Sequence, residues 1–447
     1  EMQRSLVGSE MCIRDSQHPQ DVRLRRQQMR LQRASIGTVD AFCLHFVQQN
    51  FSALDVPPDF TIADDATLVR LQQETLSTVL EQAYTDPDFC AFADLYDRGR
   101  TDDTTGRAVQ ELYHFTQALP HPAQALQRFV EMWQSDAPPE KTQWGQAVLR
   151  ETSARIKGVL RLLRTAQKIA AKDPAADKAL TAVLMDDEDR MLLVLDRLDH
   201  GAWDTVPEAL DNADNWRRAG RVPGGIASNI AAMSANMLRD RAKKQIATLK
   251  TDFLLCPAAD YQADRCRAAP LVAALVRAVE QYRRTLLEAK LAEKVLDYAD
   301  LEHMTLELLL TPEHERTSLC RTVSARYSAV LVDEYQDTNA LQDAIYFALA
   351  TPDASNLFFV GDIKQSIYRF RQADPSVFVG KQTAWQPYPA DAPVPYPEPA
   401  TIALDANFRS APDVIRGINY FFETFFSRRL GGIDSVSYTH LRAHETT

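Results

Sequence analysis

Two adjacent carboxylates follow a short apolar run in the last third of the chain. Residues 329–332 (AVLV) have the composition of a buried strand, and Asp333 and Glu334 come directly after it. Open α/β sheets bind ligands at the carboxyl ends of their strands. One acid there can hold Mg²⁺ while the other activates a water that attacks phosphorus. An acid pair that caps a helix is the structural alternative; Gln336, Asp337 and a second strand favour the site.

The second apolar run, NLFFVGD at 356–362, ends in a glycine-aspartate turn. Gln365 follows, and its neutral amide could donate to a phosphate or to the attacking water. Aromatic and cationic side chains then alternate, at Tyr368, Arg369, Phe370 and Arg371. Stacking rings beside guanidinium groups suit sequence-independent binding of single-stranded nucleic acid. Packing of these aromatics into a core is the structural alternative.

A third motif, LDANFRS at 404–410, places Arg409 between an expected strand and an expected helix. A guanidinium aimed into a cleft from that position could neutralise charge on a transferring γ-phosphate. A surface salt bridge is the structural alternative for Arg409.

The elements that must position these groups alternate between strand and helix. We predict strands at 328–332, 357–361 and 401–404, the first two as parallel neighbours, and helices at 340–350 and 410–426. The segment 386–399 contains six prolines and is expected to be an extended linker or an exposed loop.

A long helical region precedes these motifs. Apolar residues recur at helical spacing from 66 to 325, and no glycine occurs between Gly225 and Gly361. Polar or proline-bearing segments should divide the region into several helices, and they lie at 97–107, 135–142, 172–177 and 211–225. Upstream, residues 35–47 suggest a strand end, a turn and an amphipathic helix.

Composition excludes several classes of protein. The 447 residues allow two to four domains, and a net charge of −11 argues against coating nucleic acid by bulk charge, although a local basic groove stays possible. No apolar run approaches the roughly 18 residues of a membrane span. The six cysteines are scattered, which argues against a disulfide framework or a zinc site and favours the cytoplasm.

The two ends of the chain differ from the rest. Residues 1–16 are too polar for a signal peptide, and residues 436–447 lack helical or strand periodicity. Both strings resemble translated adaptor sequence, with ordinary disordered tails as the alternative. We expect 1–16 and 436–447 to be non-native tails.

The three motifs, DEYQDTN, VGDIKQSIYRFR and LDANFRS, resemble in this order motifs II, III and IV of the UvrD/RecB-like helicases. TVDAFC (38–43) resembles the motif after the first strand pair of that family, and LDYADLEHMTLELL (296–309) resembles the return from its inserted helical domain. Within that family, the sequence IYRFRQADPSVF and the long helical insertion are most similar to the AddA type of ATP-dependent helicase/nuclease subunit. The likeness is colinear over about residues 30–434.

This resemblance implies an α/β fold with a RecA-like parallel-sheet motor lobe, a large all-α insertion domain and the start of a second motor lobe. The expected boundaries are 17–65 and 296–385 for the first lobe, 66–295 for the helical (1B-like) insertion, 386–400 for the proline-rich linker, and 401–435 for the second lobe.

The resemblance also implies roles for single residues. Asp333 would hold Mg²⁺ with the nucleotide, Glu334 would be the catalytic base, and Gln365 would sense the γ-phosphate. Arg409 would be an arginine finger, and Phe408 would stack near the adenine. Four residues would contact single-stranded DNA: Thr38, Tyr368, Phe370 and Arg371. Asp40 stands where many relatives carry His, and its charge argues against a DNA contact there.

The implied function is ATP- and Mg²⁺-dependent unwinding of DNA, 3′ to 5′, with an exonuclease in the full-length protein, in the repair of double-strand breaks by recombination. The partners would be single- and double-stranded DNA and an AddB-like second subunit. No association with a membrane is expected. The alternatives are a UvrD-like repair helicase without a nuclease, or a non-catalytic helical scaffold. Joint presence of Asp333, Glu334, Gln365 and Arg409 favours the enzyme.

One expected motif is missing. The sequence contains no G-x-x-x-x-G-K-[ST] phosphate loop, and GRTDDTTGR at 99–107 has the wrong spacing. In the family this loop would lie upstream of residue 20, and the nuclease domain would lie beyond residue 434. We therefore expect an internal fragment that does not hydrolyse ATP alone.

Overall fold

The chain forms two compact units in a computed structural model. The structure describes residues 22, 26, 29, 34–97, 103–200, 203–253, 256–389, 398–404, 406–407, 410–425 and 442–443. Unit 1 comprises residues 1–84, 96–125 and 278–447, and unit 2 comprises residues 85–95 and 126–277.

Unit 1 holds a helical layer that precedes the candidate motifs. Its helices are α3 (Val39–Asn50), η1 (Phe51–Ala53), α4 (Asp65–Ala83), α6 (Asp103–Gln117), the second part of α12 (Ala258–Ala292), α13 (Tyr298–Leu309) and α14 (Ser318–Ser324). Helix α7 (Pro122–Gln134) begins in unit 1 and continues into unit 2. Two short parallel strands, β1 (Thr61–Ile62) and β2 (Val295–Leu296), join segments that are distant in sequence.

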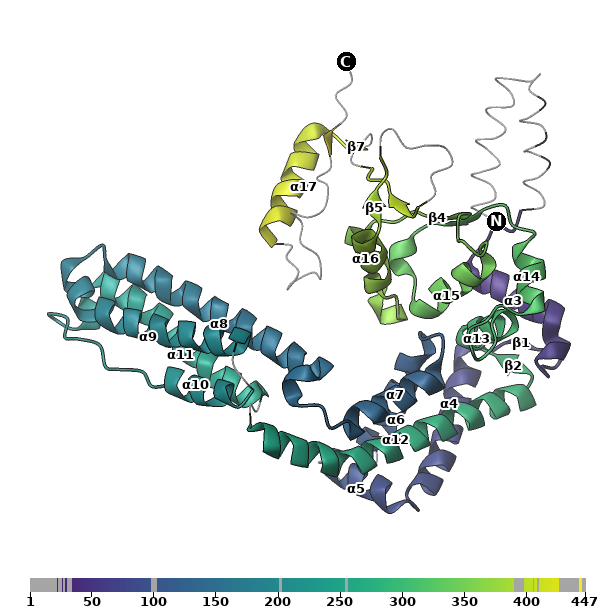
Figure 1. The fold of residues 1–447 in the computed structure, drawn as a ribbon, viewed down its shortest axis with the longest axis horizontal. Helices are drawn as coiled ribbons and strands as arrows, with labels where there is room; N and C mark the ends of the chain where they lie inside the picture. The colour runs from purple at the N-terminus through teal and green to yellow at the C-terminus, as the bar shows by residue number, and fades with distance from the viewer. Residues whose placement is uncertain are drawn as a thin grey trace. The chain divides into compact units, whose positions relative to one another are not determined.

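The motif-bearing part of unit 1 is a strand–helix–strand arrangement (Figure 1). Strand β3 (Val330–Val332) pairs in parallel with β4 (Leu357–Phe359), with Val330 opposite Leu357. Helix α15 (Ala340–Leu349) connects them, as a parallel pair requires. Short helices η4 (Tyr335–Asp337), η5 (Ile363–Gln365) and η6 (Arg369–Arg371) follow the strands, and α16 (Pro375–Ala384) comes after them.

Caps and a shared core fix the helices around this strand pair. Asn339 begins α15 with a capping box: its side chain accepts from the backbone N–H of Gln342, and the Gln342 side chain accepts from the N–H of Asn339. Helix α13 packs against α3 and α15. Fully buried Val47, Leu301 and Ile345, one from each helix, belong to one apolar cluster.

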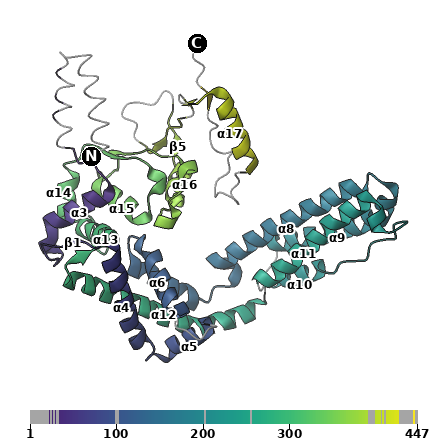
Figure 2. The ribbon, with the colours of Figure 1, turned by 180° about the vertical axis from the view of Figure 1, so that it is seen from behind.

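Unit 2 is a bundle of long helices (Figure 2). Its members are α5 (Pro87–Tyr96), the remainder of α7, η2 (Pro139–Lys141), α8 (Gln143–Ala170), α9 (Pro174–His200), α10 (Thr205–Ala213), η3 (Ile226–Ser228), α11 (Ile230–Phe253) and the first part of α12. Helices α8, α9 and α11 pack side by side around an apolar core. The acidic run of α9 is matched by arginines: Asp187, fully buried, accepts from Arg239 Nε over 2.6 Å.

Most of the expected elements are confirmed. Strands β3 and β4 are parallel neighbours, and all four expected breaks lie between helices. The described residues of 66–325 are mostly helical, with loops, strand β2 and an isolated bridge between Leu310 and Arg316 among them. Helix α15 spans almost the expected range, and α17 (Pro412–Phe425) begins at the expected proline. The mostly helical chain with small parallel sheets agrees with the α/β class, while the lobes, the insertion and their boundaries stay predictions.

Three expectations were wrong in detail. Residues 35–37 form no strand, because the chain there leads into the N-cap of α3. The ends of the proline-rich segment pair as β5 (Gln386–Pro387) and β6 (Ala400–Thr401), so β6 ends before residue 404. Strand β8 (Arg442–Ala443) pairs with β7 (Ala406–Asn407) in a range expected to lack a strand. Two-residue strands are too short to produce a sequence period.

Candidate functional site

The carboxyl ends of β3 and β4 lie side by side because the hydrogen-bond ladder continues beyond the strands. The backbone N–H of Val360 donates to the carbonyl of Val332 over 2.8 Å, and the N–H of Tyr335 donates to the carbonyl of Val360 over 2.9 Å. The two segments that follow, from Asp333 and from Gly361, therefore start next to each other. The expected juxtaposition of the two motifs is present.

The backbone turns sharply at Glu334. This residue is in the left-handed region, with φ 51° and ψ 39°, which a non-glycine residue adopts at a cost of roughly 1 kcal/mol or more. The turn leaves Asp333 and Glu334 exposed, and Asp333 Oδ1 accepts from the N–H of Glu334 over 2.9 Å. Strain of this kind clusters at functional sites, where a side chain must be aimed away from the regular strand direction.

Gln336 connects the two strand ends beneath these acids. Its side chain is buried, its Nε2 donates to Glu334 Oε2 over 2.6 Å, and its Oε1 accepts from the N–H of Asp362 over 2.9 Å. A Cβ on Gly361 would lie only 2.6 Å from Gln336 Oε1, so this close approach requires glycine. The sequence motif contains Gln336, but the spacing alone gave it no separate role.

Gln365 lies at the end of the second motif. Its Nε2 donates to Asp362 Oδ2 over 3.2 Å, and Asp362 Oδ1 also accepts from the N–H of Lys364 over 3.1 Å. The side chain of Gln365 is exposed, and its segment follows the strand end that lies beside Asp333. A local hydrogen bond to Asp362 thus orients Gln365 from the short helix η5.

Asp337 adds an unusual carboxyl to this edge. Burial raises its pKa above the ordinary value, and the charge of Glu334 raises it further. Its Oδ1 is buried without a hydrogen-bond partner in the structure. A buried oxygen of this kind is costly unless a ligand or water satisfies it.

The site fits Mg²⁺ that arrives with a nucleotide. Mg²⁺ usually keeps several waters and takes one or two carboxylates plus substrate phosphates. Asp333 offers one exposed carboxylate at a strand end. Across the described residues, no cluster of three or more His, Cys, Asp or Glu side chains could hold a metal by itself. Phosphate oxygens and waters would have to supply the remaining ligands.

Aromatic side chains pack around the residue directly behind the acid pair in the sequence. Tyr335 is fully buried and stacks on Phe359, with ring centroids 4.1 Å apart. Lys381 of α16 places its Nζ 5.7 Å from the centre of the Tyr335 ring and 2.8 Å from Asp343 Oδ2. These contacts fix the backbone immediately after Glu334 against α15 and α16.

The candidate DNA-binding aromatics are on the surface. Tyr368 and Phe370 have ring centroids 5.9 Å apart, and Phe370 is 77% exposed. Phe370 is therefore not a core residue, which removes the structural alternative for it. The backbone of Arg371 belongs to η6, but its side chain lies outside what the structure describes.

Thr38 is exposed and begins α3. Its hydroxyl oxygen accepts from the N–H of Ala41 over 3.2 Å, as an N-cap does. The nearby Asp40 is half-buried, and burial raises its pKa. Asp40 therefore faces the interior, next to the charge of Glu302.

Sequence reasoning missed two adjacent ionisable residues on α13, of which Glu302 is buried and His303 is half-buried. Glu302 accepts from Gln342 Nε2 over 2.7 Å, and burial raises its pKa to about 7. The neighbouring His303 lies with Nε2 3.1 Å from the carbonyl oxygen of Gln117, and burial lowers its pKa to about 4. Two adjacent ionisable residues within a leucine-rich helix are the signal that could have identified this pair.

Two predicted residues are untested by the geometry. Phe408 and Arg409 lie outside the residues that the structure describes. Their neighbours Ala406–Asn407 form β7, and α17 follows at Pro412.

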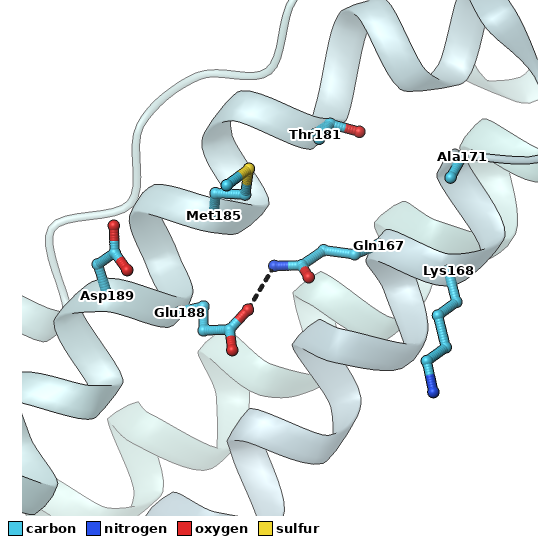
Figure 3. A pocket seen from close by; sticks show the side chains of 7 residues that line it. All are labelled: Gln167, Lys168, Ala171, Thr181, Met185, Glu188 and Asp189. Atoms are coloured by element: carbon cyan, nitrogen blue, oxygen red, sulfur yellow. Dashed lines mark hydrogen bonds between the residues drawn. The ribbon is translucent and has the colours of Figure 1, made fainter.

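A separate pocket lies in unit 2 and does not coincide with any predicted residue. Figure 3 shows it on α8 and α9, where Gln167 Nε2 donates to Glu188 Oε2 over 2.7 Å. Its volume is about 320 Å³, and an ion pair between Arg164 and Glu188 lies beside it. Three of the polar residues that line it, Gln167, Thr181 and Glu188, are hydrogen-bonded to side chains of the bundle.

The cysteines and the apolarity of the helices can be compared with the sequence expectations. The five cysteines within the described part of the chain are all free thiols. In that same part, no helix has the length and apolarity that a membrane crossing demands.

Comparison with known proteins identifies relatives for nearly the whole chain. The family profile of the UvrD/REP helicase N-terminal domain matches residues 8–386. An ATP-dependent helicase/nuclease subunit of the AddA type from Anoxybacillus flavithermus is 31% identical over 441 residues, which are 96% of this chain and 36% of the relative. Proteins of the same description from Staphylococcus aureus and Moorella thermoacetica are 30% and 31% identical. They are matched over 93% and 96% of this chain and over 34% and 31% of their own lengths. The chain spans about a third of the length of these curated relatives.

Proposed function

The chain belongs to the UvrD/REP helicase family, and on that premise we propose that it provides the hydrolytic edge of an ATP-driven DNA motor within a helicase/nuclease complex. The observation that carries this proposal is the pair of parallel strand ends, where exposed Asp333 and Glu334 lie beside the segment of Gln365. The carboxyl edge of a parallel sheet is where such proteins bind nucleotides.

Three residues of this edge receive distinct tasks in the proposal. Glu334 accepts the proton of the water that attacks the γ-phosphate, because an exposed carboxylate at a fixed turn can reach a bound water. Gln365 donates its amide to the γ-phosphate or to that water. Asp333 holds Mg²⁺, which when bound neutralises charge on the phosphates.

Two further residues of the proposal come from the second motor lobe. Arg409 would act as an arginine finger on the γ-phosphate, where a cation stabilises charge in the transition state. Phe408 would stack near the adenine. Support for both is the motif LDANFRS and the family membership of the chain.

The proposed DNA contacts involve a separate set of residues of unit 1. The exposed ring of Phe370 and the neighbouring ring of Tyr368 offer faces on which bases can stack. Arg371 and Thr38 would contact the DNA backbone. Such contacts tolerate any sequence, as a translocating motor needs. We propose that the motor moves 3′ to 5′ along single-stranded DNA and separates the duplex ahead of it.

The larger protein would process broken DNA. Each of the relatives is described as one subunit of an ATP-dependent helicase/nuclease. By that likeness we propose an exonuclease in the full-length protein, an AddB-like second subunit, and a role in double-strand break repair by recombination. The domain boundaries given above, with the helical insertion at 66–295, are part of the same proposal.

A strand-separation assay tests the function. A chimera is made in which this chain replaces the matched 441-residue segment of the Anoxybacillus flavithermus relative, because the chain itself contains no G-x-x-x-x-G-K-[ST] loop. The chimera should separate a duplex with a 3′ single-stranded tail only when ATP and Mg²⁺ are present. The same chimera with Glu334→Gln should bind the DNA and separate no strands.

The matched control is Glu313→Gln, an exposed carboxylate of unit 1 outside the site. That variant should separate strands at the rate of the unmodified chimera. Strand separation by Glu334→Gln at the control rate would refute the proposed function.

A further inference from the structure

The amide of Gln336 lies between two groups that the proposed function gives separate tasks. Its Nε2 donates to Glu334 Oε2 over 2.6 Å, and its Oε1 accepts from the N–H of Asp362 over 2.9 Å. Asp362 Oδ2 in turn accepts from Gln365 Nε2 over 3.2 Å. Hydrogen bonds therefore run without a break from the candidate base on the β3 side to the candidate γ-phosphate sensor on the β4 side.

The orientation of this amide is determined by its partners. A backbone N–H can only donate, and an ionised carboxylate can only accept. Gln336 must therefore present Oε1 to Asp362 and Nε2 to Glu334, and a flipped amide would lose both hydrogen bonds. Because the side chain is only 1% exposed, water cannot replace either partner.

The two segments are also held too close to move independently. A Cβ at Gly361 would lie 2.6 Å from Gln336 Oε1 and 3.1 Å from the Gln336 backbone nitrogen. The hydroxyl of Ser366 donates to the Gln336 carbonyl over 3.3 Å, one residue beyond Gln365. A displacement of the β4 segment therefore reaches Gln336 directly.

We propose that Gln336 is a positioning residue for ATP hydrolysis, which holds the Glu334 carboxylate in its hydrolytic orientation and couples that orientation to the segment of Gln365. This inference rests on the proposed function. The strained turn at Glu334 leaves its side chain without regular strand support, and the buried amide supplies a fixed partner in its place. Binding of a γ-phosphate at Gln365 would then be transmitted to the base through Asp362 and Gln336.

The first test removes the amide while keeping the length of the side chain. In the chimera, Gln336→Met should lower kcat for DNA-stimulated ATP hydrolysis by at least about 10-fold and leave KM for ATP within about two-fold, because a misplaced base affects the transition state rather than the bound substrate. Thermal melting should show that the variant is folded. In the 447-residue chain, the amide hydrogen of Asp362 should exchange at least about 10-fold faster in the same variant, because its acceptor is gone.

The second test keeps the size and changes one atom. Gln336→Glu retains an acceptor for Asp362 but places a second carboxylate oxygen against Glu334 Oε2 and near Asp337 Oδ2, which accepts from Gln336 Nε2 over 3.4 Å in the unmodified chain. When both carboxyls are ionised they repel, and when the introduced one is protonated it can donate as the amide did. The deficit in kcat relative to the unmodified chimera should therefore grow as the pH rises. A purely structural defect would give a deficit that does not depend on pH.

Comparison with Glu334→Gln separates the possible failures. Wild-type kcat in Gln336→Met, with Glu334→Gln inactive, would overturn the positioning role and leave the proposed function intact. Full activity in Glu334→Gln would instead overturn the proposed function. Should Gln336→Met fail to fold, the pH dependence of Gln336→Glu decides: a constant deficit, or none, refutes the inference.

Discussion

Glu302 and His303 on α13 allow a quantitative prediction about stability and pH. Burial raises the pKa of Glu302 from an ordinary 4.5 to about 7 and lowers the pKa of His303 from an ordinary 6.5 to about 4. Between pH 4.5 and 7 the folded state keeps a proton on Glu302 that the unfolded chain has released, so the free energy of unfolding falls as pH rises. Between pH 4 and 6.5 the unfolded chain binds a proton at His303 that the folded state does not, so this contribution rises with pH.

The two contributions have opposite signs and similar sizes. Each pKa displacement corresponds to roughly 3 kcal/mol over its full range, or about 1.4 kcal/mol per pH unit. They should nearly cancel from pH 4.5 to 6.5, the range that both share. The contribution of Glu302 alone continues to fall toward pH 7.

Substitution of either residue, compared with wild type, should reveal the contribution of the residue that was replaced. In Glu302→Gln, the free energy of unfolding relative to wild type should rise by about 3 kcal/mol between pH 4.5 and 7. In His303→Gln the relative free energy should fall by a similar amount between pH 4 and 6.5. Urea unfolding at each pH, monitored by pulsed hydrogen exchange of the α13 peptide, measures unit 1 separately from unit 2.

The matched control is Glu307→Gln, an exposed carboxylate on the same helix, which should leave the pH dependence unchanged. Use of differences from wild type cancels the contributions of other titrating groups. A Glu302→Gln curve parallel to wild type from pH 4.5 to 7 would refute the burial argument for this residue.

Three further substitutions test other parts of the structure. Phe370→Ala should weaken binding of single-stranded DNA by about 1–3 kcal/mol in a fluorescence anisotropy titration without lowering the melting temperature. Exposed Phe115→Ala is its control, and an equal loss of affinity in both would contradict the stacking role. Arg239→Met should destabilise unit 2 by about 3 kcal/mol in urea, because fully buried Asp187 would lose one of its two arginine partners and keep only Arg190. If Arg239→Met/Asp187→Leu does not recover much of that loss, the ion pair is not the cause. Gly361→Ala should destabilise unit 1 by about 1–3 kcal/mol, since the new methyl group would overlap Gln336; a neutral effect on urea unfolding would show that the two segments can separate freely.

The strand–helix–strand core could be predicted because its signals are local and agree. Val330–Val332 and Leu357–Phe359 are short apolar runs, and the helix between them supplies the crossover that a parallel pair requires. The breaks between the long helices were likewise visible as polar or proline-bearing segments. These features depend on residues close in sequence.

Features that depend on distant residues could not be predicted. Strand β1 pairs with β2 although Thr61 and Val295 are far apart in the sequence, and two residues carry no period. The bridge from Gln336 to Asp362 depends on how closely two backbones approach. Gly361 was the local sign of that approach, but a glycine before an aspartate also occurs in ordinary turns.

The candidate site was predicted only in part for the same reason. The spacing placed Asp333 and Glu334 at the end of one strand and Gln365 after the end of its neighbour, and the two strand ends do lie side by side. Their roles in chemistry stay predictions. Burial of Glu302 beside Asp40 required the packing of α3 on α13, which no single motif contains.

The central claim is that the paired ends of β3 and β4 hydrolyse ATP for a DNA motor. Its most direct test is the rate of ATP cleavage in a single turnover by the chimera, at saturating ATP, Mg²⁺ and single-stranded DNA, with and without Glu334→Gln. Cleavage should slow by at least ~10²-fold in the variant, while ATP affinity should stay within a few-fold, because the base acts on water and not on the bound nucleotide. Cleavage by Glu334→Gln at the rate of the unmodified chimera would contradict the claim.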